Sequence, residues 1–390
     1  MSRVAHLMGG LMAAALFTTS VVAAEPRARD LGVPFDGDPG PLNAITDVPG
    51  VEVGHTTIVT GTHGGKDPVV RTGVTAVLPR GKRSPTDAVF AGWFSQNGNG
   101  EMTGTTWVDE SGLLYGPVMI TNTHSVGVVR DAVIGWALKR YEFDTSDWWS
   151  LPVVAETWDG WLNDINGFHV KPEHAFAALD GARGGPVTEG NVGGGTGMIC
   201  YEFKGGIGTA SRIVKDEAGT YTVGVLVQAN FGRRGELLVA GVPVGREIPE
   251  EAAYAALGSK RDDRDFGSII VVVATDAPLL PHQLERIARR VTMGIARTGA
   301  VAGNGSGDIF IAFSTANAGA AEPKGLPALA MLPNDRITPF FSATVHATEE
   351  AIINALVAAR TTEGFAGHRA IALPHDRLRA VLARYNRLQR

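Results

Sequence analysis

Glycine is spread along the whole chain, where it separates short apolar runs. The 390 residues include 50 glycines, and these do not gather in a low-complexity tail. Glycine lets the backbone turn tightly and lets two segments approach closely, so this spacing predicts layered β-sheets. In one strand-like stretch, Val223, Val225 and Val227 alternate and would share one face. The clearest strand patterns cover residues 74–78, 88–93, 118–121 and 221–229.

A dense run of charges lies directly upstream of an apolar run. The stretch 245–266 contains many charged residues together with Pro249 and Gly258, which is typical of a solvated linker or surface loop. It leads into SIIVVVA at residues 268–274, a continuous apolar run that predicts a strand buried on both faces. A loop that opens onto a buried strand is the layout that a processed precursor needs.

Helix signals occur on both sides of this strand. Residues 125–141 have an amphipathic pattern, and an apolar stripe predicts a helix over 279–298, with Asp276 as its N-cap and Gly299 at its end. A further buried strand is expected at 308–314. Two more helices are expected near the end of the chain. The first would start at Thr348, Glu349 and Glu350. The second would start at Asp376, with Leu378, Leu382 and Tyr385 on its inner side.

Residues 1–24 have the pattern of a secretory signal peptide. Arg3 and His6 precede an apolar run, residues 7–22, which ends in small residues before a polar stretch. We expect cleavage after Ala24 and export to the periplasm or the medium. A stable membrane anchor is the alternative, and it is disfavoured because the run is short for a spanning helix and rich in Gly, Ala and Thr.

Composition and motifs exclude several functional classes. The formal net charge of −5 and the lack of a basic run with interleaved aromatic residues argue against a nucleic-acid partner. The sequence has no nucleophile-elbow, zinc-peptidase or phosphate-loop motif, so we expect no metal and no cofactor. The only cysteine, Cys200, lies in an apolar stretch, which favours a buried, inert thiol over a nucleophile.

Serine chemistry can still arise at a new N-terminus. A serine hydroxyl is a weak nucleophile without a base within hydrogen-bond reach. A free α-amine has a pKa of about 7.7 to 8.0, so a serine exposed by a cut directly before it carries its own base. The pair Gly267-Ser268 suits such a cut, because glycine leaves its carbonyl unshielded and allows strained backbone angles. The alternative is a commonplace Gly-Ser pair at the start of a strand.

Several long motifs lie on both sides of this junction and cover nearly all of the expected mature chain. They read AITDVPGVEVGHTT, NGNGEMTGTTWVDESG, TNTHSVGVVRDA, GNVGGGTGMICYEFKGG, VGVLVQANFGRR, FGSIIVVVATDAPLLPHQLERIARR and GNGSGDIFIAFSTAN. These motifs resemble those of the family of L-aminopeptidase/D-alanine esterases and β-peptidyl aminopeptidases. The resemblance implies an αββα layered α/β fold, similar to the N-terminal nucleophile hydrolases but with different connectivity. It also implies autoproteolysis of one catalytic domain into a larger segment, 25–267, and a smaller one, 268–390, and assembly of several such pairs into a homo-oligomer.

The resemblance also implies roles for residues around Ser268, the expected nucleophile. Ser306 and Asp308 match the family's accessory serine and acid, which would orient the freed amine and relay its proton. Asn230 matches its oxyanion donor, because a side-chain N–H can bind developing negative charge. On the residues alone, 305–308 also fits a tight turn that enters a strand, and Asn230 fits a turn at a strand end.

Two further residues match the family's substrate pocket. Glu156 matches an acid near the substrate amine, and a carboxylate favours the charged form of an ammonium group. Trp158 stands where some family members carry a tyrosine, so this chain lacks that phenolic hydroxyl and its pocket differs in shape. Ordinary core packing is the alternative for Trp158.

These features together predict an exported serine aminopeptidase. It would release N-terminal residues from short peptides, aminoacyl amides or esters through an acyl-enzyme on Ser268. Acyl transfer like that of the ornithine acetyltransferases is one alternative, although those enzymes use a threonine. A non-catalytic exported binding protein is the other, since Gly-rich loops can cradle an anion. The preference among L-α, D-α and β-amino acids stays open, because pocket shape sets it.

Overall fold

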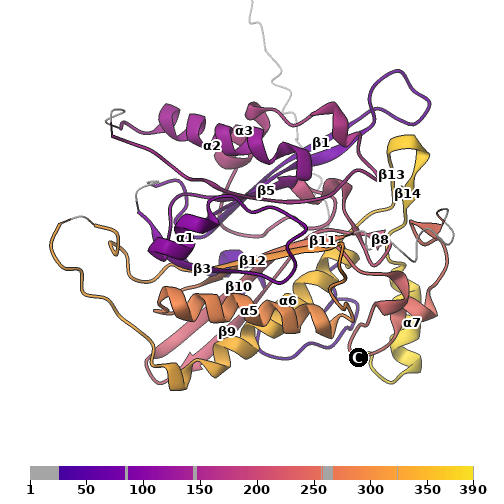
Figure 1. Cartoon of the computed structure of the whole chain (residues 1–390). Coiled ribbons are helices and arrows are strands. Elements are labelled where there is room, and N and C mark those ends of the chain that lie inside the picture. Colours follow the sequence, from indigo (N-terminus) through magenta and orange to yellow (C-terminus); the bar gives the residue numbers. More distant parts are fainter. Residues whose placement is uncertain are drawn as a thin grey trace, which may run out of the picture.

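Two β-sheets lie face to face, and helices cover their outer sides (Figure 1). The computed structural model describes residues 26–83, 87–143, 147–255, 257, 267–322 and 324–389. The expected signal peptide, residues 1–24, and much of the expected linker therefore lie outside the described residues. Within the described ranges, no helix combines the length and the apolar composition needed to cross a membrane.

The smaller sheet has four strands and the larger one has six. The smaller sheet has the order β1 (Glu52–Thr60), β2 (Val70–Leu78), β5 (Val118–Asn122) and β6 (Val153–Thr157). The larger sheet has the order β4 (Leu113–Leu114), β3 (Val89–Ser95), β12 (Gly307–Ser314), β11 (Ser268–Thr275), β10 (Gly219–Asn230) and β9 (Gly206–Asp216).

Each sheet has its own pair of covering helices. Helices α2 (Val126–Arg140) and α3 (Pro172–Asp180) pack on the smaller sheet, and α5 (Pro281–Arg297) and α6 (Thr338–Val357) pack on the larger one. The other α-helices of the described residues are α1 (Thr105–Ser111), α4 (Val244–Glu247) and α7 (His375–Arg384). The αββα order expected from the family resemblance is confirmed.

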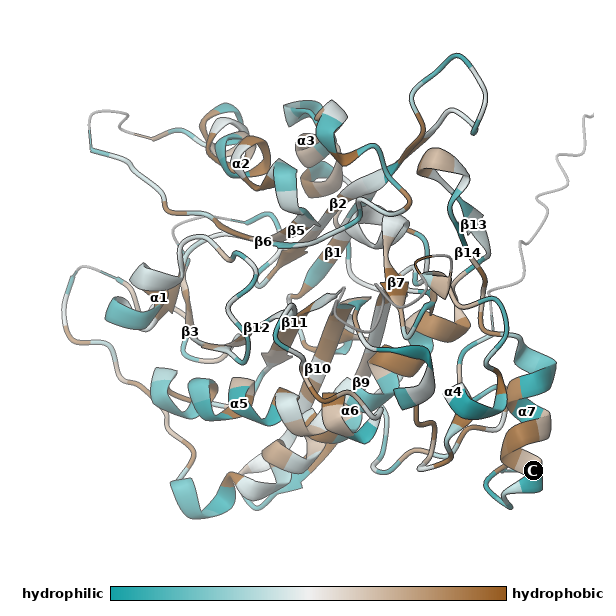
Figure 2. Ribbon diagram, turned by 45° about the vertical axis from the view of Figure 1, so that its right-hand side comes forward, coloured by the Kyte–Doolittle hydropathy of each residue, from teal (hydrophilic) through white to brown (hydrophobic). Residues whose placement is uncertain are grey.

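Apolar side chains of both sheets fill the space between them. One buried cluster joins β2 and β5 of the smaller sheet to β10, β11 and β12 of the larger one, and a second lies between the larger sheet and α5 and α6. The central strands β10 and β11 are coloured as apolar in Figure 2, whereas the outer side of α5 is hydrophilic. This two-sided burial explains why β11 reads as a continuous apolar run rather than an alternating one.

The strand expected at 268–274 is confirmed as β11, in which every residue is buried. It runs parallel to β12 and antiparallel to β10. The alternation in β10 is confirmed as well, since Val223, Val225 and Val227 all belong to the cluster that faces the helices. The Gly267-Ser268 junction therefore lies at one end of β11, in the centre of the larger sheet.

The helix expected at 279–298 is confirmed as α5, but Asp276 is not its N-cap, and Tyr385 does not lie on the inner side of α7. Helix α5 begins at Pro281, and its first turn is closed by the Gln283 side chain, which accepts a hydrogen bond from the Leu280 N–H at 3.0 Å. Asp276 instead accepts a hydrogen bond from the Thr222 N–H at 2.7 Å, because the first part of β10 lies beside it. Tyr385 follows α7 and is 43% exposed; its hydroxyl donates to Glu247.

Helix α6 begins ten residues before the expected start. It runs from Thr338, so Thr348, Glu349 and Glu350 lie in its interior and are buried. The two acids are tolerated there because each has an arginine partner: Arg297 contacts Glu349, and Arg212 contacts Glu350. The acidic pair marks ion pairs made from the helix interior, of which only Arg212–Glu350 is buried on both sides, rather than a helix N-terminus.

Candidate active site

Ser268 lies at the first position of β11 and is 3% exposed. Its neighbours in the sheet are Asn230 at the end of β10 and Gly307 at the start of β12. Side chains directly opposite on neighbouring strands share a face, so Ser268 and Asn230 point to the same side. That side is the space between the two sheets, because Ile270, two residues further along β11, belongs to the inter-sheet core.

Gly267 occupies a position that has no room for a side chain. A Cβ there would lie 2.8 Å from the Phe231 Cα and 2.9 Å from the Asn230 carbonyl oxygen. The Gly307 N–H donates a hydrogen bond of 3.4 Å to the Gly267 carbonyl oxygen. The carbonyl that precedes Ser268 therefore lies against a backbone donor, in a setting that only glycine fits.

The side-chain amide of Asn230 is held at both ends. Its Oδ1 accepts a hydrogen bond from the Ile199 N–H at 2.8 Å, and its Nδ2 donates to the Trp158 carbonyl oxygen at 2.9 Å. Nδ2 carries two hydrogens, and the contact with Trp158 uses one of them. The amide is thus fixed beside Ser268 with a second N–H to offer.

Ser306 and Asp308 form a buried pair next to the junction. The Ser306 hydroxyl donates to Asp308 Oδ1 at 2.6 Å, and the two residues are 3% and 2% exposed. Asp308 pairs in register with Ile269 rather than with Ser268. Because successive residues of a strand face opposite sides, the Asp308 side chain lies on the helix-covered side of the sheet. The pair therefore lies beside the junction, and the Asp308 carboxylate is on the opposite face of the sheet from the Ser268 hydroxyl.

A loop between β3 and α1 closes over the start of β12. Asn97 Nδ2 donates to the Gly303 carbonyl oxygen at 3.0 Å, and Asn99 Nδ2 donates to the Gly305 carbonyl oxygen at 2.7 Å. A Cβ on Gly307 would lie 2.3 Å from the Asn99 carbonyl oxygen. Sequence reasoning treated the NGNG stretch only as part of a family motif, although its repeated Asn-Gly pairs were a signal for a tight, hydrogen-bonding loop.

Glu156 lies at the end of β6, on the other side of this loop. Its Oε1 accepts a hydrogen bond from the Glu101 N–H at 3.0 Å, and its Oε2 accepts one from the Thr123 hydroxyl. A Cβ on Gly100 would lie 3.2 Å from Glu156 Oε1 and 3.2 Å from the Gly307 Cα. Burial raises the pKa of Glu156, and the bonds from Thr123 and Glu101 partly oppose this shift. The structure therefore brings Glu156 to the same end of the sheets as Ser268.

Trp158 is half-buried and contributes to the site through its backbone, since its carbonyl oxygen accepts the hydrogen bond from Asn230. A Cβ on Gly160 would lie 2.7 Å from the indole ring, so the ring folds over that glycine.

Cys200 is fully buried, and burial raises the pKa of its thiol. The burial expected for Cys200 is confirmed.

Asp159, which follows Trp158, is a buried acid that sequence reasoning missed. It is 1% exposed, and Asn163 Nδ2 donates to its Oδ1 at 3.1 Å. Burial raises the pKa of Asp159 from 3.8 to about 6. Its folded-state pKa is thus above its unfolded value, so the folded protein holds this proton more tightly and loses stability as the pH rises from about 4 to about 6.

The variant Asp159→Asn should therefore be more stable than the parent at pH 8, by about 1 to 3 kcal/mol. The gain should shrink as the pH falls toward 4, where the parent carboxyl is protonated as well. Urea unfolding from pH 4 to pH 8 measures this difference. Asp131→Asn, at a side chain that is 81% exposed, is the matched control and should show no pH-dependent gain; a gain for Asp159→Asn that is equal at all pH values would contradict the assignment.

Known proteins match this chain over nearly its whole length. Peptidase family S58 matches residues 43–370. The chain is 56% identical over 389 residues to "Beta-peptidyl aminopeptidase BapA" of Sphingosinicella microcystinivorans, covering 97% of each protein. One solved structure that matches is the L-aminopeptidase D-Ala-esterase/amidase from Ochrobactrum anthropi, described as a prototype for the serine aminopeptidases and a new variant among the Ntn hydrolase fold. It has a TM-score of 0.86 and 48% sequence identity, and the match covers 93% of this chain and 100% of that one. A β-aminopeptidase from Burkholderia sp. matches with a TM-score of 0.82 and 48% identity, over 92% and 99%.

Proposed function

Because the chain belongs to peptidase family S58 and is an aminopeptidase with a variant of the N-terminal nucleophile hydrolase fold, we propose that it cuts itself before Ser268 and then works through an acyl-enzyme on that residue. The observation that carries the proposal is the position of Ser268. It begins the central strand directly after a glycine that cannot be replaced, with Asn230 opposite and the Ser306–Asp308 pair alongside.

Self-cleavage needs only groups of the chain and one water molecule. The Ser268 hydroxyl oxygen attacks the Gly267 carbonyl carbon and gives up its proton. The peptide C–N bond then breaks, and the nitrogen takes that proton and becomes a free amine. Water then hydrolyses the resulting ester, which leaves a carboxylate on Gly267 and restores the hydroxyl of Ser268. The Gly307 N–H, 3.4 Å from the Gly267 carbonyl oxygen, supports this step because it is directed at the oxygen that becomes negative.

Turnover uses the freed amine as the base. It accepts the hydroxyl proton of Ser268 while the oxygen attacks the substrate carbonyl, and the second N–H of Asn230 binds the developing oxyanion. The proton then passes to the departing amine, and water hydrolyses the acyl-enzyme. The Ser306–Asp308 pair orients the amine of Ser268, and the Glu156 carboxylate binds the ammonium group of the substrate.

The sheet supports a cut that leaves the fold intact. Strands β11 and β12 follow the junction, yet they lie between β3 and β10, which precede it. The two products would stay interleaved in one sheet. We further propose that the protein is exported and that the cut pairs assemble into a homo-oligomer. The proposed substrates are short peptides, aminoacyl amides or esters, including peptides that begin with a β-amino acid. The names of the relatives support this last choice.

The proposal predicts two fragments for active enzyme on a denaturing gel. N-terminal sequencing should show that the smaller fragment starts at Ser268, because the nucleophile and the base belong to the same residue. Active enzyme that consists only of uncut chain would exclude the mechanism. A panel of L-α-, D-α- and β-aminoacyl amides then defines the substrate, and an added amine acceptor shows whether the acyl group goes to water or, as in an acyltransferase, to the amine.

A further inference from the structure

Lys204 is a fully buried lysine whose ammonium group contacts three backbone carbonyl oxygens. It lies in β8 (Phe203–Lys204) and has no exposed surface. Its Nζ donates to the carbonyl oxygens of Met198 at 2.8 Å, Gly205 at 2.9 Å and Gly195 at 3.2 Å. Burying a positive charge is costly unless the charge meets well-placed acceptors, so this arrangement calls for an explanation.

One of these carbonyls belongs to the peptide group that holds Asn230. The Met198 carbonyl oxygen accepts the bond from Lys204, and the N–H of the same peptide group, on Ile199, donates to Asn230 Oδ1 at 2.8 Å. The contacts therefore form a continuous chain from the ammonium group through one peptide group to the Asn230 amide. Hydrogen bonds in such a chain polarise one another.

We propose that Lys204 is a positioning residue that strengthens the Asn230 amide as a hydrogen-bond donor to the oxyanion. The ammonium group withdraws electron density from the Met198 carbonyl, which makes the Ile199 N–H more positive and the bond to Asn230 Oδ1 stronger. Withdrawal at Oδ1 in turn makes the Asn230 Nδ2–H bonds more positive. Lys204 thus makes the Asn230 N–H donor more positive without placing a charged side chain at Ser268. This inference rests on the proposed role of Asn230.

The ammonium form fits the surroundings of Lys204 better than the neutral amine. Burial lowers the pKa of Lys204 to about 7. The charged form, however, has three N–H donors for three carbonyl oxygens, whereas a neutral amine has two and would turn its lone pair toward an oxygen. Hydrogen bonds to the charged form favour it.

A purely structural role for Lys204 predicts different behaviour. The lysine also fastens the turn between β7 (Ile199–Cys200) and the start of β9, where the Gly205 N–H donates to the Met198 carbonyl oxygen at 2.9 Å. If fastening were its whole contribution, its loss would lower stability and impair the site regardless of what stands at position 230. Polarisation, in contrast, acts only when the Asn230 amide is present.

A double-mutant cycle with Lys204→Met and Asn230→Ala separates the two roles. With kcat measured per mole of cut enzyme, Asn230→Ala should lower kcat by about 100- to 1000-fold. Lys204→Met should lower kcat about fivefold to tenfold and leave KM within about twofold, because it weakens one bond made in the transition state. In the Asn230→Ala background, Lys204→Met should change kcat by less than about twofold.

A matched control is Arg71→Met, which removes another buried cation bonded to backbone carbonyls. Arg71 donates to the carbonyl oxygens of Thr60, Gly61 and Glu363. None of these belongs to the peptide group that contacts Asn230, so the loss of Arg71 should lower stability without changing kcat of the folded enzyme. If Lys204→Met does not fold, Lys204→Gln keeps N–H donors without the charge and serves in the same cycle.

Three results would overturn the inference. An unchanged kcat in the Lys204 variants would contradict the inference directly. An equal loss of kcat with Asn230 and with Asn230→Ala would assign Lys204 a structural role only. An unchanged kcat in Asn230→Ala removes it together with the oxyanion role of Asn230, while Ser268 stays in place as the nucleophile. Failure of this inference is thereby distinguished from failure of the proposed function, which depends on the cut before Ser268.

Discussion

Replacing Ser268 by alanine should leave the chain uncut and without aminopeptidase activity. In the proposed mechanism the hydroxyl is the attacking group both in self-cleavage and in turnover, so its removal should abolish the two reactions together. The loss should be complete rather than partial, because no other residue of the chain can form the ester or the acyl-enzyme in this mechanism. A denaturing gel of the purified variant and an assay with aminoacyl amides measure the two losses separately.

Two comparison variants make this result specific. Ser268→Cys keeps a nucleophile at the same position and should retain self-cleavage, at a changed rate. Ser306→Ala keeps the hydroxyl of Ser268 and removes the partner 2.6 Å from Asp308, so it should slow turnover through the orientation of the amine while Ser268 still reacts. Turnover by uncut Ser268→Ala protein would refute the mechanism.

The layout of the sheets was predictable from local patterns in the sequence. The run at 268–274 predicted β11 because a strand buried on both faces needs apolar side chains throughout. The alternation of Val223, Val225 and Val227 predicted that they share one face of a strand, and in the structure this is the helix-facing side of β10. The start of α6 was not predictable in this way. Glu350 looked like an acid at a helix N-terminus, and its arginine partners lie more than a hundred residues away.

The residues of the candidate site could be named from the sequence, whereas their contacts could not. Serine after glycine, together with the family resemblance, directed attention to Ser268 and Asn230. The partners that fix Asn230, however, are backbone groups of Ile199 and Trp158, 31 and 72 residues away in the chain. Backbone groups leave no mark in the sequence, and which of them meet depends on the packing of both sheets. The role inferred for Lys204 became visible only with those contacts.

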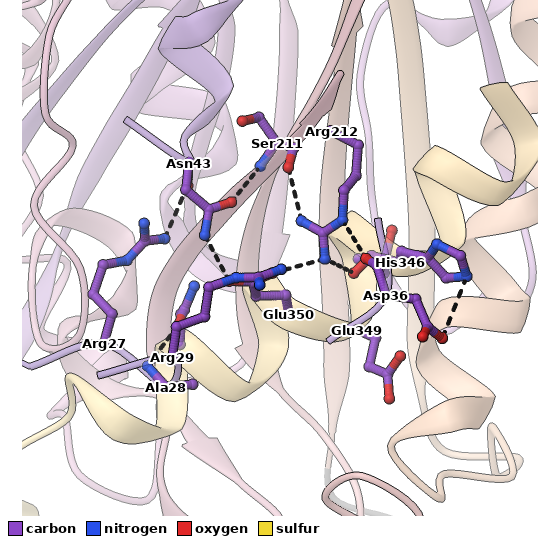
Figure 3. A network of polar contacts seen from close by, with 12 residues as sticks. Arg27, Ala28, Arg29, Asp36, Asn43, Ser211, Arg212, His346, Glu349 and Glu350 are labelled. Carbon is purple, nitrogen blue, oxygen red and sulfur yellow. Dashed lines mark hydrogen bonds and ion pairs between the residues drawn. The ribbon is translucent and has the colours of Figure 1, made fainter. Parts of the chain in front are cut away.

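A buried ion cluster joins the two segments that the proposed cut would separate. Glu350 of α6 accepts hydrogen bonds from Arg29 at 2.8 Å, Arg212 at 2.7 Å and Asn43 at 2.6 Å (Figure 3). The three donors precede Gly267, and Glu350 follows it. Glu350 and Arg212 are 0% and 1% exposed. Burial opposes ionisation of Glu350, yet the bonds from Arg29 and the charge of Arg212 hold its pKa below the usual value.

The variant Glu350→Gln should lower the free energy of unfolding by about 3 to 5 kcal/mol, because it leaves the buried Arg212 without its carboxylate. In cut enzyme, the same loss should appear as separation of the fragments on dilution, since the cluster links one fragment to the other. Denaturant unfolding and size-exclusion chromatography over a range of concentrations measure the two effects. Stability of the parent at this cluster should also fall in acid, as Glu350 becomes protonated below its lowered pKa.

The neighbouring acid provides the control. Glu349 also lies in α6, but its partner Arg297 belongs to the same segment and has a side chain that is 43% exposed. Solvent screens that pair, so Glu349→Gln should cost less than about 1 kcal/mol and should not promote separation of the fragments. Equal effects of the two substitutions would show that the helix tolerates both acids for reasons other than the cluster. A large effect confined to Glu350→Gln would show that buried charge pairing, and not only the shared sheet, holds the cut enzyme together.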